Sequence, residues 1–158
     1  MHERAVEFAE RAEAEHGLSI DVEEFPAGTR TAADAAEALD CEVAQIASSL
    51  VFVTPDGPVV VVTSGANRVS EAKLAALRGV DEGAVRTADP DEVRDAVGWS
   101  IGGVPPICHE GDVPTYLDET LLSFETVWAA AGTPEAVFPV DPGRLQEVAG
   151  ATTADVAE

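Results

Sequence analysis

The sequence predicts an α+β protein in which helices flank a curled, mixed β-sheet that is barrel-like in outline. Three observations lead to this class. Segments typical of strands and segments typical of helices are interspersed along the 158 residues. They do not follow the regular strand–helix–strand alternation that builds a parallel sheet. No internal repeat, low-complexity tract or linker divides the chain, so we expect one domain over residues 1–158.

Two neighbouring apolar segments predict the centre of the sheet. Residues 49–54 and 58–63 have the pattern of strands, and a Pro-Asp-Gly turn signal separates them, so we expect a hairpin. Four consecutive valines make the second segment apolar on both faces, which favours a central strand. Further strands are predicted over residues 19–25, 114–117, 126–130 and 136–140.

Helix signals lie between and around these strands. Ser70 is a favourable N-cap for a helix that ends before Gly79, and Asp89 followed by Pro90 opens another helix. Apolar residues at helical spacing mark the remaining helices. The predicted helices span residues 3–16, 31–39, 70–78, 89–98 and 141–148, with a short helical turn at 42–47.

The charge balance is the strongest compositional signal. Nine basic residues against thirty acidic ones give a net charge of −21, and Lys73 is the single lysine. Such a chain repels itself in dilute buffer. In molar salt the screening length falls to about 3 Å, and most of that repulsion is removed. The composition therefore favours a protein adapted to a very salty cell interior; an acidic protein that binds cations is the alternative.

This charge also changes how nucleic-acid binding is judged. In ordinary proteins a strongly acidic chain argues against an RNA partner, because phosphate contacts dominate affinity. Those contacts lose most of their strength in molar salt, where pockets, stacking and hydrogen bonds must supply recognition. The acidity therefore neither excludes nor supports an RNA partner.

Cysteine, histidine and hydropathy patterns argue against several classes of protein. Cys41 and Cys108 are too few for a disulfide framework, so we expect two free thiols. His2, His16 and His109 are scattered, so no metal site or other cofactor is predicted. No apolar run approaches the roughly 20 residues that span a bilayer, and no signal peptide pattern opens the chain. We expect a cytoplasmic protein with no membrane partner.

The most unusual segment is residues 98–106, rich in glycine and proline. The pair Gly102 and Gly103 lets the backbone bend sharply and lets a ligand approach main-chain N–H groups. Pro105 and Pro106 fix their own φ angles and stiffen the loop. A stiff loop with exposed amides is a candidate oxyanion hole for an ester carbonyl. The alternative is a structural loop that crosses the top of the sheet.

Six segments, in this order, resemble the YbaK/EbsC family of prolyl-tRNA synthetase-associated editing domains. The resemblance covers roughly residues 17–157. The segments are 45–52 (QIASSLVF), 64–69 (SGANRV), 98–106 with His109, 116–121 (YLDETL), 127–134 (VWAAAGTP) and 145–156.

The resemblance implies a fold, a reaction and partners. It implies a curled mixed sheet with flanking helices, in agreement with the pattern of elements. It implies hydrolysis, in trans, of the ester that joins an amino acid to the tRNA 3′ end, with no cofactor. The implied partners are the aminoacyl-tRNA 3′ end and an aminoacyl-tRNA synthetase. The oligomeric state is left open.

The resemblance also implies which residues form the site. The Gly-x-x-x-Pro stretch lines the pocket in the family, so Gly102, Gly103, Val104 and Pro106 are expected to position and polarise the ester carbonyl through their backbone. Ser48 stands where the family usually has lysine, and serine supplies neither the cationic head nor the reach of lysine. Catalysis could therefore be altered, reassigned or lost.

Four more residues are candidate substrate-binding positions, each with a structural alternative. His109 could bind substrate or move a proton, or be a partly buried hydrogen-bonding residue. Asp118 could pair with the substrate α-ammonium group, or cap a helix. Arg68 could bring positive charge to the pocket, or form a surface salt bridge. Gly132 could border the ligand, or serve a turn.

Three further residues carry weaker signals. Cys108 replaces a glycine that relatives more often carry, and we favour packing over a role at the pocket mouth. Trp99 and Trp128 could stack on the terminal adenine, but we favour core packing for both.

No Ser-His-Asp triad is apparent, so no nucleophilic serine is assigned. The favoured mechanism is attack by water, assisted by backbone amides and by a tRNA ribose hydroxyl. The sequence thus predicts an editing hydrolase. The alternative is a non-catalytic module that holds an aminoacyl-tRNA or a synthetase, suggested by the serine at position 48.

The charge predicts how stability depends on salt. We expect the midpoint of thermal unfolding to rise as KCl is increased from dilute buffer to molar concentration, because screening removes repulsion among the acidic residues. Circular dichroism melts across a KCl series measure this directly. Greatest stability in dilute buffer would contradict adaptation to salt.

Overall fold

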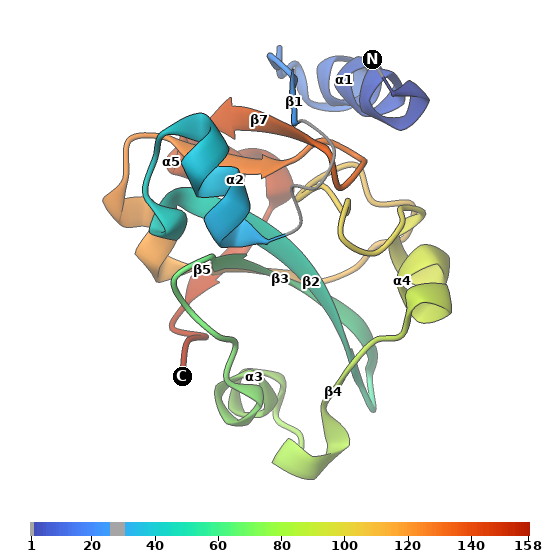
Figure 1. Cartoon of the computed structure of the whole chain (residues 1–158). Coiled ribbons are helices and arrows are strands. Elements are labelled where there is room, and N and C mark those ends of the chain that lie inside the picture. Colours follow the sequence, from blue (N-terminus) through green and yellow to red (C-terminus); the bar gives the residue numbers. More distant parts are fainter. Residues whose placement is uncertain (1, 26–30) are drawn as a thin grey trace.

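The computed structural model describes residues 2–25 and 31–158, and an eight-stranded mixed sheet runs through its centre (Figure 1). The strand order is β1-β7-β6-β2-β3-β5-β8, and β4 pairs with β2 beside this path. Three pairs, β2–β6, β3–β5 and β5–β8, are parallel. The sheet is curled but not closed into a barrel, since the order ends in β1 and β8. The strands are β1 Glu23–Glu24, β2 Ile46–Thr54, β3 Gly57–Ser64, β4 Arg86–Thr87, β5 Thr115–Asp118, β6 Val127–Ala130, β7 Ala136–Val140 and β8 Thr152–Ala154.

Helices cover both faces of this sheet. Side chains of α1, α4 and α5 join the larger apolar core, and α3 packs in a second core on the opposite face. Among the described residues, every helix is too short or too polar to cross a membrane. The α-helices are α1 Glu3–His16, α2 Ala32–Leu39, α3 Glu71–Arg78, α4 Pro90–Val97 and α5 Pro142–Ala149; short 3₁₀ helices are η1 Val43–Gln45, η2 Glu82–Ala84 and η3 Glu119–Ser123.

The four valines of β3 show why this strand is central. Val60 and Val62 lie in the larger core, whereas Val59 and Val61 lie in the core beneath α3. All four are at most 1% exposed. The two-sided burial confirms the central strand, and the pairing of β2 with β3 confirms the predicted hairpin.

Short and polar strands were the elements that pattern reasoning missed. The strand predicted at 19–25 is reduced to β1, whose two glutamates pair with the end of β7. Neither β4 nor β8 was predicted, because two or three polar residues show no alternation. The helical turn predicted at 42–47 is η1, and β2 already begins at Ile46.

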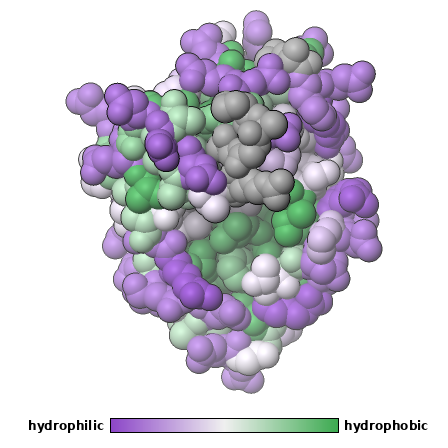
Figure 2. Space-filling model, viewed as in Figure 1, coloured by the Kyte–Doolittle hydropathy of each residue, from purple (hydrophilic) through white to green (hydrophobic). Residues whose placement is uncertain are grey.

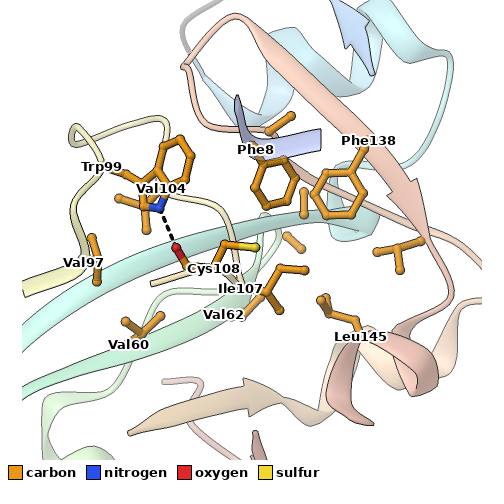
Figure 3. Close-up of a cluster of buried hydrophobic side chains, with 14 of the residues drawn as sticks. Phe8, Val60, Val62, Val97, Trp99, Val104, Ile107, Cys108, Phe138 and Leu145 are labelled. Carbon is orange, nitrogen blue, oxygen red and sulfur yellow. Dashed lines mark hydrogen bonds between the residues drawn. The ribbon is translucent and has the colours of Figure 1, made fainter. Parts of the chain in front are cut away.

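Trp99 fixes the loop that follows α4 against α1. Its ring is fully buried and meets Phe8 of α1 edge-on, at 6.0 Å between centroids (Figure 3). Its indole Nε1–H donates to the Cys108 carbonyl at 2.9 Å. The guanidinium groups of Arg4 and Arg11 lie over the ring, 4.0 and 5.6 Å from its centroid. Trp99 therefore packs in the core, as favoured from the sequence.

Asp118 ends β5 and caps η3. Its Oδ1 accepts from the Thr120 amide at 3.0 Å, and its Oδ2 accepts from Ser64 N at 3.1 Å and Asn67 Nδ2 at 2.9 Å. Burial alone would raise the pKa of this carboxyl, but the hydrogen bonds from Asn67, Ser64 and Thr120 favour the charged form and leave the pKa lowered. The capping alternative for Asp118 is thus the role that its contacts support.

Gly132 is required by the close approach of α1. It lies after β6 with φ of +94°, in the left-handed region. A Cβ atom here would lie 2.8 Å from the Arg4 carbonyl oxygen and 2.8 Å from the Trp99 ring. Both obstacles belong to the packed core, so neither can move cheaply.

Gly132→Ala should lower the free energy of unfolding by about 2 kcal/mol or more, since left-handed strain adds to overpacking. Gly79→Ala is the matched control, because Gly79 has φ of +69° and open space where a Cβ would be. Denaturant unfolding of both variants separates the two effects. Equal losses would show that the contact with α1 contributes nothing.

Candidate functional site

The sheet has a gap along one edge of β2. On this edge, β6 pairs with Ile46 and Ala47, and β4 pairs with Phe52 and Val53. No described strand pairs with residues 48–50 on this side. A cavity of about 240 Å³ lies at this gap. A site here can therefore reach the main chain as well as side chains from both faces of the strand.

The cavity is apolar and has no charged side chain among its described lining residues. Figure 2 shows an apolar hollow on this face, between the surfaces of α2, α4 and α3. Its volume is below the roughly 300–1,000 Å³ of pockets that hold drug-sized ligands. The lining includes Phe25, Thr31, Ala32, Ala35, Ile46, Ala47, Ser48, Ser49, Leu50, Val51, Thr87, Ala88, Val93, Ile101, Gly102, Val104, Trp128, Ala130, Pro134, Ala136 and Val137.

The glycine-proline loop forms one wall of this cavity. Gly102 and Val104 line it, and among the described residues no acceptor binds the amide of either. The Gly103 amide instead donates to the Ser100 carbonyl at 3.0 Å. A Cβ on Gly103 would lie 2.6 Å from Thr133 Cα, so glycine allows the loop to pack on the following turn. Two main-chain N–H groups of wall residues thus have no acceptor in the described part of the chain, and the third is used inside the loop.

Ser48 and Ser49 line the opposite wall, on β2. The Ser49 hydroxyl oxygen is buried and has no hydrogen-bond partner in the described part of the chain. Neither serine hydroxyl forms a hydrogen bond with a histidine or carboxylate there, and neither type of side chain is among the described lining residues. The described walls therefore offer main-chain N–H groups and hydroxyls, but no side chain able to act as a general base near neutral pH.

The other predicted site residues are not brought to this cavity. Pro106 and His109 line a separate hollow beside the end of α1. Asp118 is enclosed in its capping network, and Gly132 packs against α1 and Trp99. Arg68 lies in a third, more open hollow, with its side chain 88% exposed and its Nε 3.6 Å from the Glu158 carboxylate.

His109 and Cys108 shape the far side of the loop. The Nε2–H of His109 donates to the Pro105 carbonyl at 2.8 Å, and burial lowers the pKa of the imidazole. Cys108 is 4% exposed and has φ of +64°, a left-handed conformation that glycine adopts with less strain than cysteine. Burial raises the pKa of its thiol to about 11. Its packing in the core agrees with the interpretation favoured from the sequence.

Trp128, α2 and the sheet gap are the parts of the cavity that sequence reasoning did not assign. Trp128 is half-buried: it packs against the small apolar cluster of Ala35, Ala36 and Ile46, in line with the core packing favoured for it, and it also lines the cavity. The pairing of β2 with both β6 and β4 along one edge cannot be predicted from the pattern of polar and apolar residues. The small residues of α2, such as Ala32 and Ala35, were a signal of close approach that could have been used.

The fold and the chain match known editing domains. A family model of the aminoacyl-tRNA editing domain matches residues 26–148. A solved structure of a proposed trans-editing enzyme for prolyl-tRNA synthetase has a TM-score of 0.94 and 42% identity, covering 100% of this chain and 99% of that one. The hypothetical protein APE2540 has a TM-score of 0.84 and 32% identity, covering 98% and 99%.

Curated relatives are of two lengths. The uncharacterised protein YwhH of Bacillus subtilis is 32% identical over 128 residues, 80% of each chain. EbsC of Enterococcus faecalis, a proposed Cys-tRNA(Pro)/Cys-tRNA(Cys) deacylase, is 29% identical over 127 residues, 75% of this chain and 76% of EbsC. The proline–tRNA ligase of Lactobacillus gasseri is 32% identical over 96 residues, 61% of this chain but 17% of the ligase.

These matches confirm the resemblance seen in the sequence. The family model covers most of the chain, and the short relatives match over most of their own length. The chain therefore belongs to the aminoacyl-tRNA editing domain family.

Proposed function

We propose that this protein hydrolyses the ester of mischarged aminoacyl-tRNA in trans, in the cytoplasm of a cell with high internal salt. One observation carries the proposal: a small apolar cavity at a gap in the sheet is walled in part by Gly102 and Val104, whose amides bind no acceptor in residues 2–25 and 31–158. A short aminoacyl side chain occupies the cavity, and the ester carbonyl oxygen accepts from these amides.

The chemistry follows from what the walls contain. Water attacks the ester carbon, and negative charge develops on the carbonyl oxygen, where main-chain donors stabilise it. The bond to the ribose oxygen then breaks, the ribose oxygen takes a proton, and the free amino acid leaves. Because the described walls hold no general base, the neighbouring ribose hydroxyl of the tRNA directs the water.

The tRNA end has a place beside the cavity. An open hollow of about 940 Å³ adjoins it and shares Leu50 and Thr87 with it. Leu50 is 39% exposed, which gives an apolar surface on which a base can pack. Arg68 lies in this hollow, but Glu71, Glu82 and Glu158 do too. Phosphate attraction is therefore weak here, and contact with the base and ribose supplies the binding.

Two variants of Val104 test the main-chain donor. Val104→Pro removes the N–H of residue 104. Because Val104 precedes Pro105, its backbone already favours the extended conformation that a proline accepts. Val104→Ala shortens the side chain and keeps the N–H. With alanyl-, seryl-, threonyl- and cysteinyl-tRNA in molar KCl, we expect Val104→Pro to lower kcat about 100- to 1,000-fold and Val104→Ala to cost far less.

Thermal unfolding of both Val104 variants is the control for folding. Equal activity of the two variants, at equal stability, would contradict a catalytic role for the amide. If the unmodified protein hydrolyses none of the four aminoacyl-tRNA substrates, the deacylase function itself is rejected.

Ser48 distinguishes the hydrolase from the alternative, a module that binds aminoacyl-tRNA without turnover. We expect the unmodified protein to be active and Ser48→Lys to raise the rate about 10- to 100-fold, because a cation strengthens binding of the oxyanion. Thr87→Lys, which adds the same charge at another wall, should give no such gain. If the unmodified protein binds aminoacyl-tRNA tightly without hydrolysing it, and only Ser48→Lys hydrolyses it, the binding module is favoured.

A further inference from the structure

The end of α1 and the loop after Trp99 bring three different metal-ligand side chains together. A carboxylate oxygen of Glu15, a ring nitrogen of His16 and the sulfur of Cys108 all lie within 4.8 Å of one another. We propose that these three residues bind one zinc ion. This site lies on the far side of the loop from the cavity and does not depend on the proposed function.

The donor set selects the metal. A thiolate, an imidazole and a carboxylate are the ligands that Zn²⁺ takes in proteins, usually in tetrahedral geometry. Mg²⁺ and Ca²⁺ prefer oxygen ligands alone. Zinc bond lengths place tetrahedral ligands roughly 3.3–3.7 Å apart, so ligand atoms that lie within 4.8 Å of one another need to move closer by at most about 1.5 Å. Three protein ligands leave the fourth position to water.

The surroundings hold two of the ligands in place. Glu15 Oε2 accepts from Arg11 Nε at 2.8 Å, which orients the carboxylate as hydrogen bonds around metal sites commonly do. The Cys108 carbonyl accepts from the Trp99 indole, so the backbone that carries the sulfur is anchored (Figure 3). The three residues also line an open hollow of about 200 Å³, which gives an ion a path from solvent.

The consequence is a cross-link between α1 and the loop that forms the wall of the cavity. Glu15 and His16 belong to the last turn of α1, and Cys108 follows the glycine-proline segment by two residues. Bound zinc would hold these segments together and stabilise the loop without touching the ester.

Cobalt(II) is the probe, because a thiolate ligand gives a sulfur-to-metal charge-transfer band and tetrahedral sites give intense visible bands. Metal-free protein in KCl with excess Mg²⁺ is titrated with Co²⁺ and then with Zn²⁺. We expect one equivalent of Co²⁺ to produce the thiolate band, one equivalent of Zn²⁺ to remove it, and Zn²⁺ to raise the unfolding temperature.

Three variants assign the signal. Cys108→Gly removes the thiolate, and the glycine suits the left-handed backbone, which offsets part of the core packing lost with the side chain; the variant should fold while losing the band. His16→Gln should weaken Co²⁺ binding at least tenfold. Cys41→Ser, which alters the other thiol, should change nothing. Absence of a thiolate band, or a band that survives Cys108→Gly, would overturn the proposal.

Discussion

The burial of Trp99 is the interaction on which the rest of this structure depends. Its ring closes the core beneath α1, and its one polar atom donates to the Cys108 carbonyl. This bond joins the two ends of the segment that contains Gly102 and Val104. A loop of glycine and proline with little secondary structure is thereby held in one shape, and Gly102 and Val104 keep a fixed place beside the cavity. Without this anchor, ordering the loop would cost conformational entropy each time a ligand bound.

The cavity shows how a sheet can provide a site without charged groups. Where β2 lacks a neighbour, the strand edge opens between β6 and β4, and small residues of α2 and β6 leave room for a ligand. The polar groups at the walls are amides and hydroxyls. Such neutral donors are weakened less by salt than ion pairs are, which suits the very acidic composition of the chain.

Much of the fold could be predicted because long elements carry periodic patterns. The β2–β3 hairpin, the helices with a capping residue and a closing glycine, and the two-sided valine strand were all anticipated for physical reasons that the structure bears out. Two-residue pairings such as β4 with β2 could not be anticipated. They depend on one or two main-chain hydrogen bonds, which, unlike burial, produce no pattern of apolar residues.

The site was predicted less completely than the fold. Gly102, Val104 and Ser48 line one cavity, and their part in catalysis stays a prediction. Pro106 and His109 do not join them, because the loop turns within a few residues and presents its later part to the end of α1. Asp118 is acidic and near a strand end, but four donors surround it. Sequence position alone cannot distinguish a carboxylate that faces a ligand from one that completes a network.

The position of α1 has a consequence for how the domain is delimited. The matched family region begins at residue 26, after this helix. Yet Ala5, Phe8 and Ala12 are fully buried in the larger core. A fragment trimmed to the family boundary would leave a tryptophan and a phenylalanine bare to water, and it would be prone to aggregate. The physical unit of folding therefore extends further toward the N-terminus than the region matched by the family model.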